Sequence, residues 1–298
     1  MARRATPGID GLCVVDKPAG WTSHDVVAKA RGILGTRKVG HSGTLDPDAT
    51  GVLLLGVGRG TRLLRYLVGL PKSYVGELVL GTETSTLDAS GDVVAVHPTD
   101  GIDVATLRAA VPAFVGDIEQ VPPMVSAIRI DGRRLHELAR EGIEIERPAR
   151  PVTVTRYDVA ATADPTVFRI EVDCSSGTYV RSLAADLGRA VGSGAHLRAL
   201  RRTAVGPHLV ADARPLDALD LLPLDACVRH LERLDCTEEE TARLRHGGRL
   251  AAERVGGDGP WAAFGPTGTL VAILERRADR LVGPSVVLEA AGNDPQVG

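Results

Sequence analysis

Residues 41–51 place one carboxylate in a short loop that is rich in glycine and proline. Pro47 biases the residue before it, Asp46, toward an extended backbone, and the flanking glycines relax the steric limits on either side. The apolar residues 52–55 follow directly and predict a buried strand. A carboxylate held beside a core strand could act as a nucleophile or as a base. Since an Asp-Pro pair is also an ordinary turn signal, both interpretations stay open at this point.

Three further residues could take part in chemistry. Asp48 could share a magnesium ion with Asp46, although two carboxylates without a third oxygen ligand nearby make a poor site. Tyr74 begins a predicted strand, where a half-buried aromatic residue is ordinary core. Arg181 lies in the first turn of a predicted helix, where a cation opposes the helix dipole. A partner anion for Arg181 or a simple surface position would each explain this placement.

Signatures of other chemistries are weak or missing from the sequence. The glycine-rich residues 56–60 lack the spacing of a dinucleotide-binding loop and the Gly-Lys-Ser/Thr of a Walker loop. The sequence contains no Gly-x-Ser-x-Gly and no His-Glu-x-x-His motif. Residues 200–202 (Leu-Arg-Arg) add basic charge, which would serve either phosphate binding or a surface ion pair.

Length and composition set the outer bounds. The chain has 298 residues, of which 44% are hydrophobic and 3% aromatic, so the core is built mainly from Leu, Val, Ile and Ala. No apolar run approaches the ~18 residues of a membrane helix, and the N-terminus lacks the apolar segment of a signal peptide. The four cysteines show no Cys-x-x-Cys spacing and predict reduced, mostly buried thiols. We therefore expect a cytoplasmic protein without a membrane segment or a zinc site.

The net charge of −3 hides a segregation of charge along the chain. Residues 1–72 carry 11 Lys and Arg against 5 Asp and Glu, whereas residues 73–120 carry 1 against 8. Residues 173–214 are basic again, with 6 against 3. Basic groups therefore surround the Asp46 loop and the Arg181 region, which indicates one positive face for an anionic polymer.

The sequence predicts both helices and strands as the elements that position these residues. Thr22 and Asp25 have capping-box spacing at the start of a helix that Gly35 ends. Thr178 can cap a helix over residues 179–190, whose apolar residues recur at helical spacing. A further short helix is predicted over residues 61–68. Strands are predicted at residues 12–16, 52–55, 73–80, 152–159 and 167–174.

Two other segments carry turn and boundary signals. Residues 131–132 (Asp-Gly) predict a turn after a strand at residues 126–130, leading into a helix through Leu135 and Leu138. A domain boundary is predicted within residues 210–236, where Leu, Asp and Pro recur. Beyond it, short apolar pieces separated by Gly and Pro predict a small β-rich module.

The sequence resembles the TruB family of tRNA pseudouridine synthases. The likeness begins with the run around Asp46 and continues in the family's order over roughly residues 10–210. Its motifs are residues 40–51, residues 15–25 with the Lys-Pro pair, Lys72-Ser73-Tyr74, residues 120–127, residues 174–181, residues 194–197 and residues 200–202.

This resemblance implies a fold, a reaction and a partner. The fold would be α+β, with a mixed, largely antiparallel sheet and flanking helices over residues 1–225. Residues 237–298 would form a small β-rich, PUA-like RNA-contacting domain, although their 7 Lys and Arg against 9 Asp and Glu require a local basic patch. The reaction would be isomerisation of uridine 55 in the T loop of tRNA after base flipping, with neither cofactor nor metal. The partner would be the tRNA T stem-loop, bound by a monomer without an obligatory protein partner.

The resemblance also assigns roles to residues. Asp46 would be the catalytic carboxylate, Tyr74 would stack on the target base and move a proton, and Arg181 would pair with Asp46. His41 would help to occupy the space left by the extruded base, and Lys17 with Pro18 would support the loop. The substrate-binding residues would be His41, Lys17, Tyr179, Leu200 and Arg202.

Two alternatives use the same residues differently. A non-catalytic RNA-folding protein would use the basic face without needing Asp46. A metal-dependent phosphoryl-transfer enzyme would depend on both Asp46 and Asp48.

Overall fold

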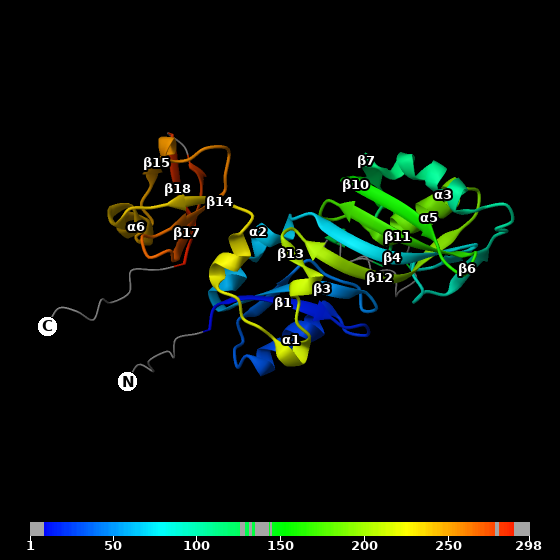
Figure 1. The fold of residues 1–298 in the computed structure, drawn as a ribbon, viewed down its shortest axis with the longest axis horizontal. Helices are drawn as coiled ribbons and strands as arrows, with labels where there is room; N and C mark the ends of the chain where they lie inside the picture. Colours follow the sequence, from blue (N-terminus) through cyan, green and yellow to red (C-terminus); the bar gives the residue numbers. More distant parts are fainter. Residues whose placement is uncertain are drawn as a thin grey trace.

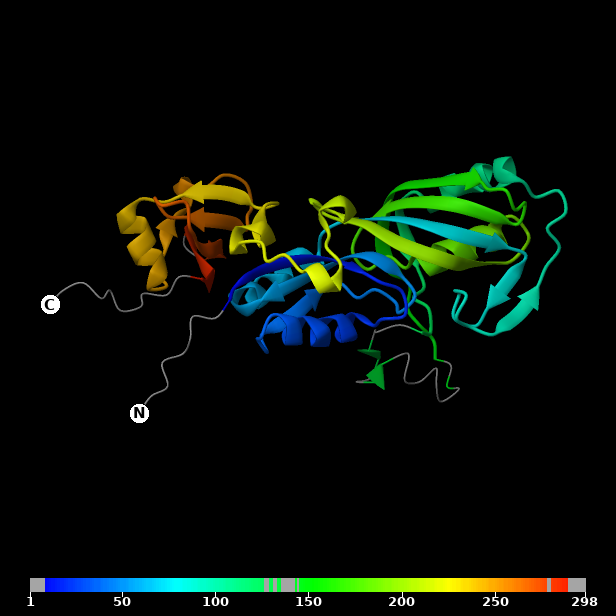
Figure 2. The same ribbon diagram turned by 60° about the horizontal axis from the view of Figure 1, so that its bottom comes forward.

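The computed structural model describes residues 9–125, 129–130, 133–134, 143, 145–277 and 280–288 of the chain. Figures 1 and 2 show two β-sheets at different places along an elongated molecule, with helices packed on both. Within the described residues, no helix combines the length and the apolar character needed to cross a membrane.

The larger sheet carries the Asp46 loop (Figure 1). Its main path runs in the order β1-β3-β12-β4-β11-β10-β7, with β2 beside β3 and β13 beside β12. The pairs are antiparallel except that β12 runs parallel to β3. The bounds are β1 Gly11–Lys17, β2 Val39–Ser42, β3 Thr50–Val57, β4 Lys72–Leu80, β7 Gly116–Gln120, β10 Arg150–Ala161, β11 Val167–Cys174, β12 Ala195–Val205 and β13 His208–Leu209.

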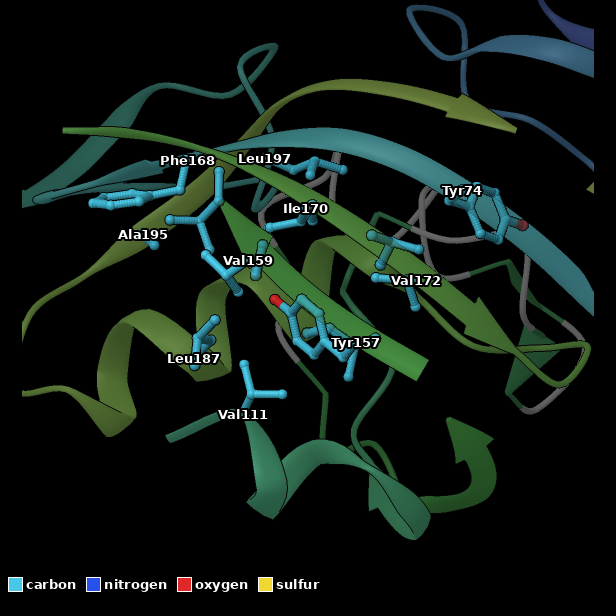
Figure 3. Close-up of a cluster of buried hydrophobic side chains, with 14 of the residues drawn as sticks. Tyr74, Val111, Tyr157, Val159, Phe168, Ile170, Val172, Leu187, Ala195 and Leu197 are labelled. Carbon is cyan, nitrogen blue, oxygen red and sulfur yellow. The ribbon is translucent and has the colours of Figure 1, made fainter. Parts of the chain in front are cut away.

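Helices cover this sheet because each buries an apolar stripe against it. In α5 (Val180–Ala190) the stripe includes Leu183 and Leu187, which pack into one cluster with residues of β4, β10 and β11 (Figure 3). The helix α1 (Ser23–Ile33) packs in a separate cluster with β1 and β3. The remaining helices near this sheet are η1 Gly58–Arg62, α2 Leu64–Val68, α3 Val104–Ala110 and η2 Val111–Phe114.

Strand β1 would be an open edge, but a later segment covers it. Leu12 exchanges two backbone hydrogen bonds with Leu222, and Arg214 bonds to the backbone of Val14 and Asp16. A covered edge cannot pair with another chain. This connecting segment contains the short helices η3 Val210–Asp212, η4 Leu216–Ala218 and η5 Leu224–Val228.

The second sheet has the order β14-β16-β17-β18-β15. Two helices lie between its strands in the sequence, α6 (Glu238–Arg245) and η6 (Ala252–Arg254). The second sheet packs on the first unit through a shared apolar cluster in which Phe264 and Ile273 meet Leu63 and Leu67. The Tyr66 hydroxyl adds polar contacts, 3.0 Å from Glu275 and 2.7 Å from Ser285. The strand bounds are β14 Glu232–Asp235, β15 Leu250–Ala251, β16 Trp261–Phe264, β17 Leu270–Arg277 and β18 Leu281–Val287.

Two short hairpins lie outside both sheets. Strands β5 (Thr82–Thr84) and β6 (Val93–Val96) pair with each other and project from one end of the larger sheet (Figure 2). Strands β8 (Arg129–Ile130) and β9 (Arg133–Arg134) pair with each other, and residues 131–132, where the Asp-Gly turn was predicted, lie outside the described residues. The helix expected through Leu135 and Leu138 lies outside the described residues.

The expected α+β class, with a largely antiparallel sheet and a β-rich C-terminal unit, is confirmed. The capping box of Thr22 and Asp25 is also present, and all four cysteines are free and buried. The helix expected over residues 61–68 is divided at Leu63 into η1 and α2; just before it, Gly60 packs so closely on β1 that a Cβ there would lie 2.2 Å from the Gly11 carbonyl oxygen. Strand β14 belongs to the second sheet although it precedes residue 237.

Candidate active site

Asp46 lies in the loop between β2 and β3, and this loop is tied to α1. The buried Ser23 hydroxyl accepts a hydrogen bond from the Leu45 amide (3.0 Å) and lies 3.2 Å from the Leu45 carbonyl oxygen, to which it also donates. The Ala49 amide donates to the Asp46 carbonyl oxygen at 3.1 Å and closes a turn. The expected turn is therefore present, and it holds the Asp46 backbone without using its carboxylate.

Lys17 supports the same loop from the end of β1. Its ammonium group is fully buried and donates to the carbonyl oxygens of Pro47 (2.7 Å), Trp21 (2.6 Å) and Pro18 (2.9 Å). Burial lowers the pKa of Lys17 to about 8, while the carboxylates of Asp48 and Asp46 oppose that shift. Lys17 thus contacts the loop through Pro47, and it does not line the cavity described below.

Arg202 holds the loop from β12. It is 1% exposed, and its guanidinium donates to the carbonyl oxygens of Val52 (2.7 Å), Gly43 (3.1 Å) and Thr44 (3.4 Å). Gly51 makes this approach possible, since its φ is +99° and a Cβ there would lie 2.1 Å from the Arg202 carbonyl oxygen. Of the two roles expected for residues 200–202, the surface ion pair belongs to Arg201, which binds Asp16 at 2.7 Å.

The start of α5 is fixed by a side chain from another strand. Gln120, at the end of β7, accepts from the Tyr179 amide (2.8 Å) and donates to its carbonyl oxygen (3.1 Å). Tyr179 is the N-cap residue, so the expected cap by Thr178 is wrong. The Thr178 hydroxyl instead donates to the Ser175 carbonyl oxygen at 3.0 Å, because the chain turns one residue later than expected.

The guanidinium of Arg181 meets Asp46 across 135 residues of sequence. Its Nε lies 3.1 Å from Asp46 Oδ2, and its Nη1 lies 3.2 Å from Asp88 Oδ2. It also donates to the carbonyl oxygens of Thr86 and Val125, both at 2.9 Å. The Arg181 side chain is only 5% exposed, whereas that of Asp46 is 44% exposed. The cation is therefore locked in place while the carboxylate stays open to a ligand.

The surroundings of Asp46 contain groups that raise the pKa of its carboxyl and groups that lower it. Burial raises the pKa of the Asp46 carboxyl above its usual range; Arg181 opposes the shift and Asp88 adds to it. Asp46 therefore titrates at higher pH than an ordinary aspartate, and Arg181 favours its ionised form.

Tyr74 projects from β4 at the end of the apolar cluster, with its hydroxyl pointing away from the other labelled side chains (Figure 3). Burial raises the pKa of the Tyr74 phenol, and the nearby Arg202 guanidinium opposes that shift. A phenol with a raised pKa is a poor base at neutral pH, so stacking is the role that this environment favours.

An open cavity of about 270 Å³ brings most of the predicted site residues together. Its wall includes Asp46, Tyr74, Tyr179, Arg181, Leu200 and Arg202. A neighbouring cavity of about 250 Å³ shares Asp46, Arg181 and Leu200 with it, so the Asp46–Arg181 pair stands between the two.

His41, like Lys17, is a predicted substrate-binding residue that does not line the cavity. It sits in β2 with its ring edge-on to His24, at 5.3 Å between ring centres. Burial lowers its pKa, with smaller contributions from His24 and Arg202. Its Nδ1 is buried without a hydrogen-bond partner among the described residues.

Three residues of this site had no role assigned from the sequence: Asp88, Gln120 and Lys72. Gln120 and Lys72 fall inside the family motifs, so position within a motif was the available signal. Asp88 lies in the acidic stretch of residues 73–120, where nothing distinguishes it from seven other carboxylates. Only the folded chain brings it to Arg181.

The two-carboxylate metal site gains no support from the donor set. In the described part of the chain, no three His, Cys, Asp or Glu side chains gather as metal ligands. Asp46 is engaged by Arg181, and Asp48 is exposed.

Comparison with protein families gives three adjacent matches. Residues 31–180 match the TruB family pseudouridylate synthase (N terminal domain). Residues 181–234 match the tRNA pseudouridylate synthase B C-terminal domain, and residues 231–288 match tRNA Pseudouridine synthase II, C terminal. Together they cover residues 31–288, which include the cavity wall, the C-terminal unit and every strand of the larger sheet except β1.

Curated relatives match over most of their length. The tRNA pseudouridine synthase B of Corynebacterium aurimucosum is 49% identical, over 91% of this chain and 94% of its own. That of Nocardia farcinica is 48% identical, over 97% and 96%. Among solved structures, a chain of a Cbf5-Nop10-Gar1 complex has a TM-score of 0.71 at 27% identity, covering 93% of this chain and 84% of its own. A chain of an H/ACA RNP bound to a substrate RNA containing 2′-deoxyuridine has a TM-score of 0.69 at 25% identity, covering 93% and 84%.

Proposed function

Because the chain belongs to the TruB family of tRNA pseudouridine synthases, it is an isomerase that converts uridine to pseudouridine in tRNA, and we propose that its target is uridine 55 in the T loop. The observation that carries the proposed site is the Asp46–Arg181 pair, an accessible carboxylate held by a buried guanidinium in the wall of an open cavity.

The reaction needs what these residues supply. The bond between uracil N1 and the sugar C1′ breaks, the base turns, and C5 bonds to C1′; the C5 proton leaves and N1 gains one. No electron is lost and no group departs, so the chemistry itself calls for neither a redox cofactor nor a metal. The ionised Asp46 either attacks covalently or removes a sugar proton, and both routes begin from the same carboxylate.

The target base must leave the folded T loop to reach Asp46, and we propose that it is flipped into the cavity. Tyr74 stacks on the flipped base, a contact worth about 1–3 kcal/mol. Tyr179 and Leu200 complete the wall around it, and Arg202 keeps the loop in position. His41 would occupy the space that the base vacates, which its position outside the cavity wall permits.

We propose that residues 1–225 form the catalytic domain and residues 237–298 an RNA-contacting domain of PUA type. The apolar cluster shared by the two sheets supports a fixed arrangement of these parts. Exposed arginines on the second sheet, including Arg276 and Arg277, offer the local basic patch that its acidic balance requires. We expect a monomer to act on tRNA without an obligatory protein partner.

Tritium release tests the reaction and the role of Asp46 together. A T stem-loop RNA labelled at C5 of uridine should lose tritium when mixed with the protein alone, and chromatography of its nucleosides should show one pseudouridine. Asp46→Asn should lower the rate by at least about 10⁴-fold, because the amide can neither attack nor accept a proton. Undiminished release by this variant would refute the assignment.

The same variant separates the alternative functions. If the protein acts mainly by folding RNA, Asp46→Asn should lose tritium release and still refold tRNA. A metal-dependent enzyme would instead lose activity with a chelator and on Asp48→Ala.

A further inference from the structure

Lys72, at the start of β4, is a second buried charge in the wall of the cavity. The residue is 6% exposed and lies two positions before Tyr74, so both side chains leave the same face of the strand. Arg202 is the cross-strand partner of Tyr74 in the β12–β4 register and therefore belongs to that face as well. The end of the Lys72 side chain and the Arg202 guanidinium both approach Gly43: a Cβ there would lie 3.5 Å from Lys72 Cε and 3.7 Å from Arg202 Nη1.

These two cations have no counter-charge within the described part of the chain. The Lys72 ammonium donates to the carbonyl oxygens of Leu70 (2.7 Å) and Val68 (3.0 Å), and Arg202 donates to carbonyl oxygens and hydrogen-bonds the Tyr74 side chain. Arg181, in the same wall, is paired with the carboxylates of two aspartates. Burying like charges side by side is unfavourable unless an anion joins them.

Further features of this part of the wall suit an anion. An ammonium has three donors and the two carbonyl oxygens use two of them, so one is left for a ligand. Ser176, whose hydroxyl donates to the same Val68 oxygen at 2.7 Å, also lines the cavity. The first turn of α5 lines it too, and the side chain of the N-cap residue does not cap that turn.

Burial, and then the charge of Arg202, lower the pKa of Lys72 to about 8. An anion beside the ammonium would favour the charged form and raise that pKa again. Binding of an anion near pH 8 should therefore be accompanied by uptake of a proton.

We propose that Lys72 binds a backbone phosphate of the RNA substrate next to the flipped uridine. This inference rests on the proposed function, because the RNA strand that delivers the base carries a phosphodiester into the same cavity. The competing explanation is purely structural: Lys72 would only cap the carbonyl groups at and just after the end of α2. A phosphate contact and a cap differ in their dependence on salt and on the charge of the RNA.

The first experiment measures the salt dependence of RNA binding. All proteins carry Asp46→Asn, so that the T stem-loop RNA is bound without being converted. Lys72→Met should weaken binding about tenfold at low salt and reduce the slope of log Kd against log salt by about 0.7, the value for one single-strand phosphate contact. Lys72→Arg should restore the slope but abolish proton uptake near pH 8, since arginine does not titrate there. A cap alone would lower the unfolding midpoint of Lys72→Met and leave the slope unchanged, which would overturn the proposal.

The second experiment locates the phosphate. Methylphosphonate linkages, which carry no charge, replace the phosphates around the target uridine one at a time. With Lys72 present, one linkage should cost about tenfold in affinity, and that linkage should cost nothing further in Lys72→Met. Lys29→Met removes the same charge from an exposed position on α1 outside the cavity, and it should keep the parent's sensitivity to that linkage.

The outcomes separate the two proposals. If Lys72→Met responds to every linkage as its parent does, the phosphate contact is wrong, even when the wild-type protein isomerises uridine. If the wild-type protein binds the RNA and isomerises nothing, the proposed function fails whatever Lys72 does.

Discussion

The α5 side and the β12 side of the Asp46 loop each contribute one buried arginine, and the two arginines have different partners. Arg181, from α5, meets the carboxylates of Asp46 and Asp88 and two carbonyl oxygens. Arg202, from β12, meets three carbonyl oxygens and no carboxylate within the described residues. The same side chain therefore serves two purposes in one cavity wall.

The difference separates electrostatics from geometry. Arg181 acts on the reactive acid directly, since its charge opposes the rise in the pKa of Asp46. Arg202 acts on the backbone that carries the acid and influences the pKa values of Tyr74 and Lys72 instead. Loss of the first should change how the rate depends on pH, and loss of the second should change how firmly the loop is held.

Among the variants that test this difference between the two arginines and their partners, Arg181→Met should have the largest effect. The reactive carboxylate loses the cation that orients it and favours its ionised form, so kcat/KM should fall by about 10²–10³-fold, which corresponds to about 3–4 kcal/mol of transition-state stabilisation. Without the guanidinium the pKa of Asp46 rises further, and because the ionised form is active, the acid limb of the pH–rate profile should move to higher pH. Steady-state rates from pH 5 to 8 measure both changes. An acid limb that stays in place would break the proposed division of roles.

Arg202→Met should act mainly on stability. One buried and two partly buried carbonyl oxygens lose a charged donor, which should lower the free energy of unfolding by about 2–3 kcal/mol. Urea denaturation measures this loss, and the acid limb should remain where it is in the wild type, since Arg202 is not among the groups that shift Asp46. If the acid limb moved as far as in Arg181→Met, the two arginines would not differ in the way proposed.

The smallest effect is expected from Asp88→Asn, which changes the second carboxylate on Arg181. Asp88 raises the pKa of Asp46, so its neutralisation should lower that pKa and move the acid limb to lower pH, opposite to Arg181→Met. At neutral pH kcat/KM should fall about tenfold or less, because Arg181 still pairs with Asp46 and loses only the charge of its second carboxylate partner. A shift of the limb to higher pH would show that Asp88 acts on Asp46 through Arg181 rather than through its own charge.

Sequence patterns predicted the elements better than their contacts. Apolar periodicity located β3, β4, β11 and α5, because each buries a face whose spacing is set by the strand or helix repeat. The predicted N-cap residue of α5 was wrong, since the choice between Thr178 and Tyr179 depends on Gln120, which lies at the end of β7.

The site shows the same limit. Asp46, Tyr74 and Arg181 could be singled out by motif order, and the fold places all three in one cavity wall. Asp88 could not be singled out, because its only distinguishing feature is its distance from a side chain 93 residues later. Lys17 and His41 were expected to contact the substrate, yet neither lines the cavity.

By itself the sequence determined the family, the α+β class and the residue types that meet at the loop, since these depend on local spacing and on the order of motifs. Tertiary structure alone decided which charges are paired and which are left over. Pairing depends on distances of about 3 Å between residues far apart in the chain, and burial then decides how much an unpaired charge matters. In the sequence, Arg181 and Lys72 are both simply cations. In the folded protein, Arg181 is paired with two carboxylates, whereas Lys72 has none among the described residues.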